Sequence, residues 1–185
     1  MATAWVGIGA NLGQPDRAVR DAIDALAELG PVRASSLYRT EPHGLRDQPW
    51  FVNAVAAVES GLGPLELLGR LQALERAAGR VDSGPRWGPR ELDLDLLMLG
   101  DLVLATPELS LPHPRFHERR FVLEPLVEIA PELRDPRSGK NARELLRDLD
   151  DPLRSERIPV DATRRMGGTS EGRSPRDRRP EVHRR

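Results

Sequence analysis

The segment Glu91-Leu-Asp-Leu-Asp-Leu-Leu-Met98 most constrains how this chain can fold, because acidic and apolar residues alternate along it. A period of two predicts a β-strand, since successive side chains of a strand point to opposite faces. Asp93 and Asp95 then share one face, with Cβ atoms roughly 6 to 7 Å apart at a rise of about 3.3 Å per residue. The strand must therefore pack into a sheet through its leucines and present both carboxylates on the other side.

The remaining periodicity predicts the other elements of the fold. Strands are expected over residues 5–10, 32–38, 51–58, 92–99 and about 102–104, and helices over about 16–29, 64–78, 119–129 and 142–149. The order strand, helix, strand, strand, helix, strand predicts an α+β fold, a ferredoxin-like βαββαβ sandwich with extra C-terminal helices.

Residues 1–159 are predicted to form a single domain, followed by an Arg-rich tail. Residues 160–185 hold eight arginines and four acids with almost no large apolar side chains, so we expect this tail to be disordered. With 38% hydrophobic and 31% charged residues, no cysteine and no long apolar run, the chain has the composition of a soluble globular protein. No signal-peptide pattern is present at the N-terminus. We expect a cytoplasmic monomer that binds neither nucleic acid nor a membrane.

The paired aspartates indicate a metal site. Two carboxylates on one strand repel each other unless a cation lies beside them, and Mg²⁺ prefers such oxygen ligands while it keeps positions open for water and phosphate. The alternative is a solvent-facing strand that carries two acids. Aspartate is a poor strand former, which favours the metal over this alternative.

The loop before this strand is predicted to bind phosphate. It contains three arginines, Arg80, Arg86 and Arg90, among glycines and prolines. A guanidinium group can bind two phosphate oxygens at once, in a bidentate contact, and Trp87 adds a flat apolar wall. Gln72 and Glu75 share a polar face on the preceding helix, which either lines the same cleft or is ordinary surface.

Three other motifs do not support their usual functions. Gly7-Ile-Gly9-Ala-Asn-Leu-Gly13 has its third glycine one residue late for a dinucleotide fingerprint, and residues 79–84 have P-loop glycine spacing without the following lysine. His113 and His117 have metal-like spacing, but the prolines at 112 and 114 prevent a shared helical face. Residues 111–121 are better explained as a basic, aromatic loop near the phosphates, with Arg119 as a further anion contact.

Taken together and in this order, these segments resemble the hydroxymethyl-dihydropterin pyrophosphokinases of folate biosynthesis. The matching stretches are Gly7-Ile-Gly-Ala-Asn-Leu-Gly13, Ser36-Leu-Tyr-Arg-Thr-Glu-Pro42, Asp47-Gln-Pro-Trp-Phe-Val-Asn53, Arg86-Trp-Gly-Pro-Arg-Glu-Leu-Asp-Leu-Asp95, Leu111-Pro-His113 and Arg119-Arg-Phe-Val-Leu123 with Pro125-Leu126. They cover the body of the chain from about Ala4 to Leu133. Asp82 stands where members often carry a basic residue, and Pro114 stands where an aromatic residue is common.

The resemblance implies an enzyme that transfers the pyrophosphoryl group of ATP to the hydroxymethyl group of a dihydropterin and releases AMP. It implies that Asp93 and Asp95 hold two Mg²⁺ ions. The residues implied on the phosphate and nucleotide side are Arg80, Arg90, Arg86, Trp87, His113, Arg119, Gln72, Glu75, Ser110 and the backbone around Leu96. The residues implied on the pterin side are Phe51 and Phe121 for stacking, Asn53 for hydrogen bonding, and the backbone around Thr40 and Pro42.

Two other functions remain open at this point. One is another metal-dependent nucleotide transferase with an Asp-x-Asp pair, such as a glycosyltransferase, although such an enzyme is usually larger than this chain. The other is an RNA-binding ferredoxin-like module with a basic tail. An RNA-binding sheet needs exposed aromatics and a basic body, whereas aromatics make up 4% of this chain and its body is acidic.

Overall fold

The structure, a computed structural model, describes residues 1–79 and 88–159. A six-stranded sheet has the strand order β5-β1-β4-β3-β8, and β2 also pairs with β4. Its strands are β1 (Ala2–Ala10), β2 (Val32–Ala34), β3 (Tyr38–Thr40), β4 (Phe51–Ser60), β5 (Asp93–Leu99) and β8 (Ser155–Arg157). Every pairing in this sheet is antiparallel. The predicted combination of helices with an antiparallel sheet is confirmed.

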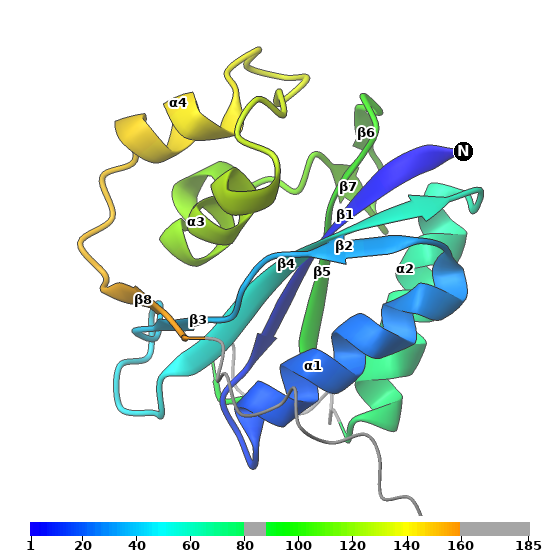
Figure 1. Ribbon diagram of the computed structural model, residues 1–185. Helices are drawn as coiled ribbons and strands as arrows, with labels where there is room; N and C mark the ends of the chain where they lie inside the picture. Colours follow the sequence, from blue (N-terminus) through cyan, green and yellow to red (C-terminus); the bar gives the residue numbers. More distant parts are fainter. Residues whose placement is uncertain (80–87, 160–185) are drawn as a thin grey trace, which may run out of the picture.

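Four α-helices flank the sheet (Figure 1): α1 (Pro15–Leu26), α2 (Pro64–Ala77), α3 (Arg120–Ile129) and α4 (Ala142–Asp148). Short 3₁₀ turns, η1 (Ala27–Leu29) and η2 (Phe116–Glu118), extend α1 and precede α3, and β6 (Leu104–Ala105) with β7 (Ser110–Leu111) forms a separate hairpin. Within the described residues, no helix combines the length and apolarity needed to cross a membrane.

The two faces of the sheet have separate hydrophobic cores. One face packs against α1 and α2 through alternate residues of β1, β4 and β5. These residues are Ala4, Val6, Ile8 and Ala10 of β1, Val52, Ala54, Ala56 and Val58 of β4, and Leu94 and Leu96 of β5. The opposite face packs against α3 around Trp5, Val55 and Leu97, and α4 packs onto α3 (Figure 1). The leucines of β5 are buried and both aspartates are only partly buried, so the predicted alternation of this strand is confirmed.

A β-bulge separates the apolar end of β5 from its acidic end. In the pairing with β1, Trp5 faces Met98 and the next residue, Val6, faces Leu96, so Leu97 has no partner. Bulges of this kind locally re-aim the strand and are frequent beside functional sites. The carbonyl oxygen of Leu97 accepts a hydrogen bond of 2.7 Å from the backbone N–H of His113. The bulge therefore attaches the loop that contains His113 to the sheet.

The strand expected over residues 32–38 is instead two strands, β2 and β3. Ser35 lies at the break, where its backbone N–H donates to the oxygen of Val55 and its hydroxyl accepts from the nitrogen of Val55. A side-chain oxygen thus replaces a backbone oxygen in the ladder, a competition that is typical of serine. Alternation alone does not reveal such a break.

Glu75 of α2 supports the edge of the sheet next to the aspartates. β5 is an edge strand, and Glu75 Oε1 accepts a 2.8 Å hydrogen bond from the backbone N–H of Leu94. Glu75 is 4% exposed, so it satisfies a donor that water does not reach freely.

We predict that Glu75→Ala lowers the free energy of unfolding by about 1–3 kcal/mol, because the Leu94 N–H loses its buried acceptor. Urea denaturation measures this change. Glu75→Gln is the matched control, since its side-chain oxygen still accepts the hydrogen bond, and it should cost clearly less. Equal stabilities for wild type and Glu75→Ala would contradict this role.

Candidate functional site

A cavity of about 310 Å³ opens on the sheet face that carries α3, beyond the part that this helix packs against. Its floor is unusually flat because two residues of β1 have no side chain. The β1–β5 register places Gly9 opposite Asp93 and Gly7 opposite Asp95. On the other side of β1, Gly9 pairs with Asn53. Two glycines on one strand thus leave room between the carboxylates of β5 and the amide of β4.

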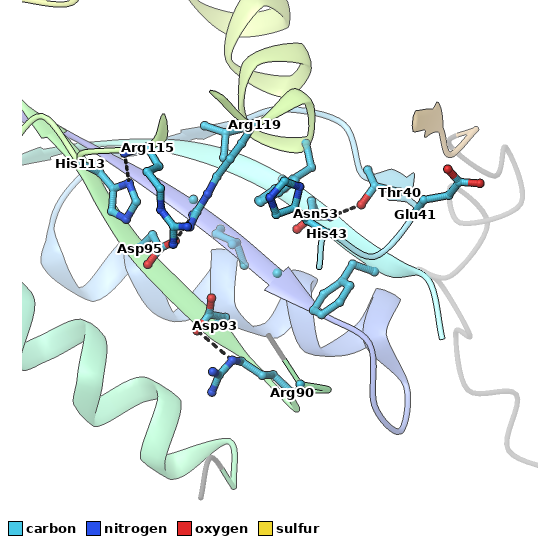
Figure 2. Close-up of a pocket in the computed structure, with 18 residues that line it drawn as sticks. Thr40, Glu41, His43, Asn53, Arg90, Asp93, Asp95, His113, Arg115 and Arg119 are labelled. Carbon is cyan, nitrogen blue, oxygen red and sulfur yellow. Dashed lines mark hydrogen bonds and ion pairs between the residues drawn. The ribbon is translucent and has the colours of Figure 1, made fainter. Parts of the chain in front are cut away.

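The two carboxylates project into this cavity from β5 (Figure 2). Their side chains are about one-third exposed, at 35% for Asp93 and 34% for Asp95. Arg90 Nε lies 3.7 Å from Asp93 Oδ1, and Arg119 Nη1 donates a 3.0 Å hydrogen bond to Asp95 Oδ2. Each acid is therefore partly neutralised and still open to the cavity.

The donor set fits Mg²⁺. Carboxylate oxygens are hard ligands, and Mg²⁺ is usually held by one or two carboxylates together with water and phosphate oxygens. Among the residues that the structure describes, no third acidic or histidine side chain completes a metal-binding cluster with this pair. The pair thus suits a cation that takes its remaining ligands from water and a bound anion.

Arg119, His113 and Arg115 make the wall next to Asp95 basic (Figure 2). Arg119 precedes α3, is 7% exposed, and its guanidinium carbon lies 5.5 Å from the centre of the Phe121 ring. Burial lowers the pKa of His113, and Arg119 and Arg115 act in the same direction, whereas Asp95 opposes them. His113 Nδ1 accepts a 3.2 Å hydrogen bond from the Arg115 backbone N–H, so a neutral imidazole carries its proton on Nε2.

The other end of the cavity combines a buried amide with aromatic rings. Asn53 is 5% exposed, and its Nδ2 donates a 2.7 Å hydrogen bond to Thr40 Oγ1. Phe51 of β4 lies near this amide, since both border the same position beside Gly9, and Phe121 of α3 lines the cavity next to Arg119. This bond fixes the amide, so its remaining polar groups can recognise a flat heterocycle between apolar rings.

Buried Asn11 connects the two loops that border the cavity. Its Oδ1 accepts a 2.8 Å hydrogen bond from the Arg90 backbone N–H, and its Nδ2 donates to the oxygen of Pro49 at 3.0 Å. The backbone N–H groups of Asn11 and Leu12 both donate to the oxygen of Arg90. Asn11 thus fixes the position of Arg90 beside Asp93.

The structure brings most of the predicted site residues together. Those that line the cavity are Thr40, Phe51, Asn53, Arg90, Asp93, Asp95, His113, Arg119 and Phe121. Those outside its lining are Pro42, Gln72, Glu75, Leu96 and Ser110. The predicted residues Arg80, Arg86 and Trp87, together with Asp82 and the tail, lie outside the described residues.

Several cavity residues were not predicted as site residues. They are Gly7, Gly9, Glu41, His43, Ala54, Gly88, Arg115 and Val122, with the backbone of Ile8. The spacing of Gly7 and Gly9 in the sequence could have indicated that they belong to the site, because it is the same period of two as that of Asp93 and Asp95.

Comparison with known proteins identifies the family. Residues 5–131 match the family described as 7,8-dihydro-6-hydroxymethylpterin-pyrophosphokinase (HPPK). The chain belongs to the HPPK family. A 2-amino-4-hydroxy-6-hydroxymethyldihydropteridine pyrophosphokinase of Pseudomonas aeruginosa is 46% identical over 145 residues, which span 77% of this chain and 88% of that protein. The protein of the same name from Haemophilus influenzae is 43% identical over 141 residues, 75% of this chain and 88% of that one.

Solved structures extend the likeness to the fold. The crystal structure of wild-type Plasmodium falciparum HPPK-DHPS with pteroate superposes with a TM-score of 0.65 at 15% identity. The match covers 79% of this chain and 42% of that one, so this chain spans less than half of the larger protein. At this identity the comparison concerns the fold alone.

We predict that Gly9→Ala displaces the Asn53 amide. A Cβ at this position would lie 2.8 Å from Asn53 Oδ1, too close for two such atoms, so the hydrogen bond to Thr40 must break or bend. We expect a loss of about 1 kcal/mol in the free energy of unfolding and shifted NMR signals of the Asn53 side-chain amide.

Gly7→Ala is the matched control for this substitution. Its Cβ would meet the side chain of Leu97 at an ordinary contact distance of 3.4 Å. We expect the Asn53 amide signals to stay in place in this variant. Unchanged signals in Gly9→Ala would contradict the close approach of Gly9 to Asn53.

Proposed function

We propose that this chain transfers the pyrophosphoryl group of ATP to the hydroxymethyl group of 6-hydroxymethyl-7,8-dihydropterin and releases AMP, a step of folate biosynthesis. The observation that carries this proposal is a single cavity that is lined by a carboxylate pair with its arginines, by a fixed amide and by two phenylalanine rings. Such a cavity can hold a metal–triphosphate and a flat heterocycle side by side, and the chain belongs to the HPPK family. Family membership disfavours both alternatives that the sequence left open.

At the phosphate end, we propose that Asp93 and Asp95 hold two Mg²⁺ ions. When bound, such ions neutralise the triphosphate charge and help to align the reacting oxygens. Arg90 and Arg119 already lie beside the two carboxylates, where they can pair with phosphate oxygens. Neutral His113 can donate a hydrogen bond from Nε2 to an anion.

Four more nucleotide contacts are proposed on the strength of the resemblance. They are Gln72, Glu75, Ser110 and the backbone around Leu96. The hydrogen bond that Glu75 accepts from the backbone N–H of Leu94 supports a role for Glu75 in holding β5 in place as well. We propose that Arg80, Arg86 and Trp87 complete the phosphate and nucleotide site from the loop that precedes β5.

At the pterin end, we propose that Asn53 and the backbone around Thr40 and Pro42 bind the amide-like edge of the ring while Phe51 and Phe121 stack on its faces. The hydroxymethyl oxygen then attacks the β-phosphorus and loses its proton to solvent, the bond from this phosphorus to the oxygen that bridges it to the α-phosphorus breaks, and AMP leaves with that oxygen. Phosphoryl transfer of this kind depends mainly on positioning and charge neutralisation. Rigid β-strands supply the positioning, and the arginines supply the charge neutralisation.

We further propose that the main sheet is a variant of the ferredoxin-like βαββαβ sandwich with α3 and α4 added after it. The order β5-β1-β4-β3 and the two helices α1 and α2 on one face support this assignment. We also propose that residues 1–159 act as a single domain and that the protein is a cytoplasmic monomer.

The nucleotide product distinguishes the proposed reaction from other uses of the cavity. We expect chromatography after incubation with ATP, Mg²⁺ and hydroxymethyl-dihydropterin to show AMP in a one-to-one ratio to the pyrophosphorylated pterin. ADP would mean transfer of a single phosphoryl group, and unchanged ATP would refute the proposal.

We predict that Asp95→Ala lowers kcat by about 1,000-fold or more, because it removes a metal ligand from the reacting centre. Circular dichroism should show an intact fold. Asp101→Ala is the control, since Asp101 is exposed in the turn after β5 and lies outside the cavity lining, and it should retain full activity. Activity of Asp95→Ala near the wild-type level would overturn the metal assignment.

A further inference from the structure

Loop 41–50 connects two strands that both contribute to the pterin end of the cavity. It follows Thr40 of β3 and precedes Phe51 of β4. Its first residue, Glu41, lines the cavity together with Thr40 and Phe51. Any shift at either end of this loop therefore moves groups that we propose to contact the heterocycle.

One side chain from the C-terminal part of the chain contacts both ends of this loop. Arg154 Nε donates a 2.8 Å hydrogen bond to Glu41 Oε1, and Nη2 lies 2.8 Å from the same oxygen. The Arg154 backbone N–H donates to Glu41 Oε2 at 3.1 Å, and the Glu41 backbone N–H donates to the oxygen of Arg154 at 3.0 Å. Its guanidinium carbon also lies 5.0 Å from the centre of the Trp50 ring, a cation–π contact.

Arg154 can act as a fixed point because its own segment is fastened on both sides. After it, β8 pairs with β3, with Ser155 opposite Thr40. Before it, buried Asp151 accepts hydrogen bonds from the backbone N–H groups of Arg120 and Leu153. Segment 151–157 therefore joins α3, which begins beside the cavity, to the strand that carries Thr40.

The charges agree with this arrangement. Hydrogen bonds from the Arg154 backbone and then from its side chain lower the pKa of Glu41, so Glu41 is a carboxylate at neutral pH. The Glu41 side chain is 25% exposed and that of Arg154 is 69% exposed. Arg154 thus covers the Glu41 carboxylate on its solvent side, and Glu41 is also one of the residues that line the cavity.

We infer that Arg154 is a positioning residue for the heterocyclic substrate: it clips Glu41 and Trp50, the two ends of loop 41–50, to the C-terminal strand. This inference rests on the proposed function for the identity of the substrate, but the clip itself is a property of the free protein. Arg154 does not line the cavity, so it acts through the loop. Nucleotide binding lies at the opposite end and should not depend on it.

The test compares Arg154→Ala with Arg157→Ala in the full-length protein. Arg157 ends β8, the strand that Arg154 directly precedes, but its guanidinium bonds Ser36 and Glu128, away from the loop. We expect Arg154→Ala to raise the KM for hydroxymethyl-dihydropterin about fivefold, the size of effect that one exposed ion pair and one exposed cation–π contact allow. The KM for ATP and kcat should stay within about twofold of wild type, and Arg157→Ala should change none of the three.

A second measurement reports the clip without any turnover. Arg46 is a trypsin site inside loop 41–50, and cleavage there requires the loop to open locally. We expect cleavage after Arg46 to be faster in Arg154→Ala than in wild type and in Arg157→Ala. Mass spectrometry measures the rate of this cleavage. Arg154→Lys keeps a charge but cannot reproduce the contact of two guanidinium nitrogens with Glu41 Oε1, and it should restore protection in part.

The outcomes separate this inference from the proposed function. Faster cleavage with a raised pterin KM in Arg154→Ala alone supports the clip. Equal effects of Arg157→Ala, an unchanged KM in an active enzyme, or unchanged cleavage would each overturn it. If wild type forms no AMP, the proposed function fails, and the cleavage rates alone then decide whether the clip exists.

Discussion

The antiparallel pairing of β5 with β1 is the constraint on which the site depends. It places two side-chain-free residues, Gly7 and Gly9, directly opposite Asp95 and Asp93. The strands thus provide a rigid, open floor with both carboxylates at its edge, and rigid elements hold reacting groups more accurately than loops do. A side chain at Gly9 would occupy the space of the Asn53 amide, so the same glycine also sets the opposite end of the cavity.

Electrostatics explain why the acidic pair can exist in the folded protein. Two carboxylates on one strand face repel each other, and Arg90 and Arg119 each lie beside one of them. These arginines are held by other parts of the fold. Asn11 bonds the backbone of Arg90, and Arg119 is buried at the start of α3. The site is therefore held together by opposite charges drawn from separate segments of the chain.

Much of the fold and of the site was predictable because it depends on local pattern. Period-two alternation fixed the common face of the aspartates, and helical stripes gave the four helices to within a few residues. Local pattern did not reveal β8, since Ser155-Glu-Arg157 has no apolar face and becomes a strand only through pairing with β3. It also missed Glu41 and Arg115, because nothing in the neighbouring sequence distinguishes them from other charged loop residues. Only the folded structure shows that they line the cavity.

By itself, the sequence determined which residue types lie on each face of the long strands β1, β4 and β5, the order of the main helices and strands and, through its motifs, the family. The tertiary structure alone decided how much of the second sheet face α3 covers, and hence where the cavity lies. It also decided that the bulge at Leu97 attaches His113 to the sheet and that Arg154 reaches Glu41. The reason is physical: side-chain alternation follows from backbone geometry within a few residues, whereas register, coverage and ion pairing join residues that are more than 100 positions apart, such as Tyr38 with Arg157 and Glu41 with Arg154.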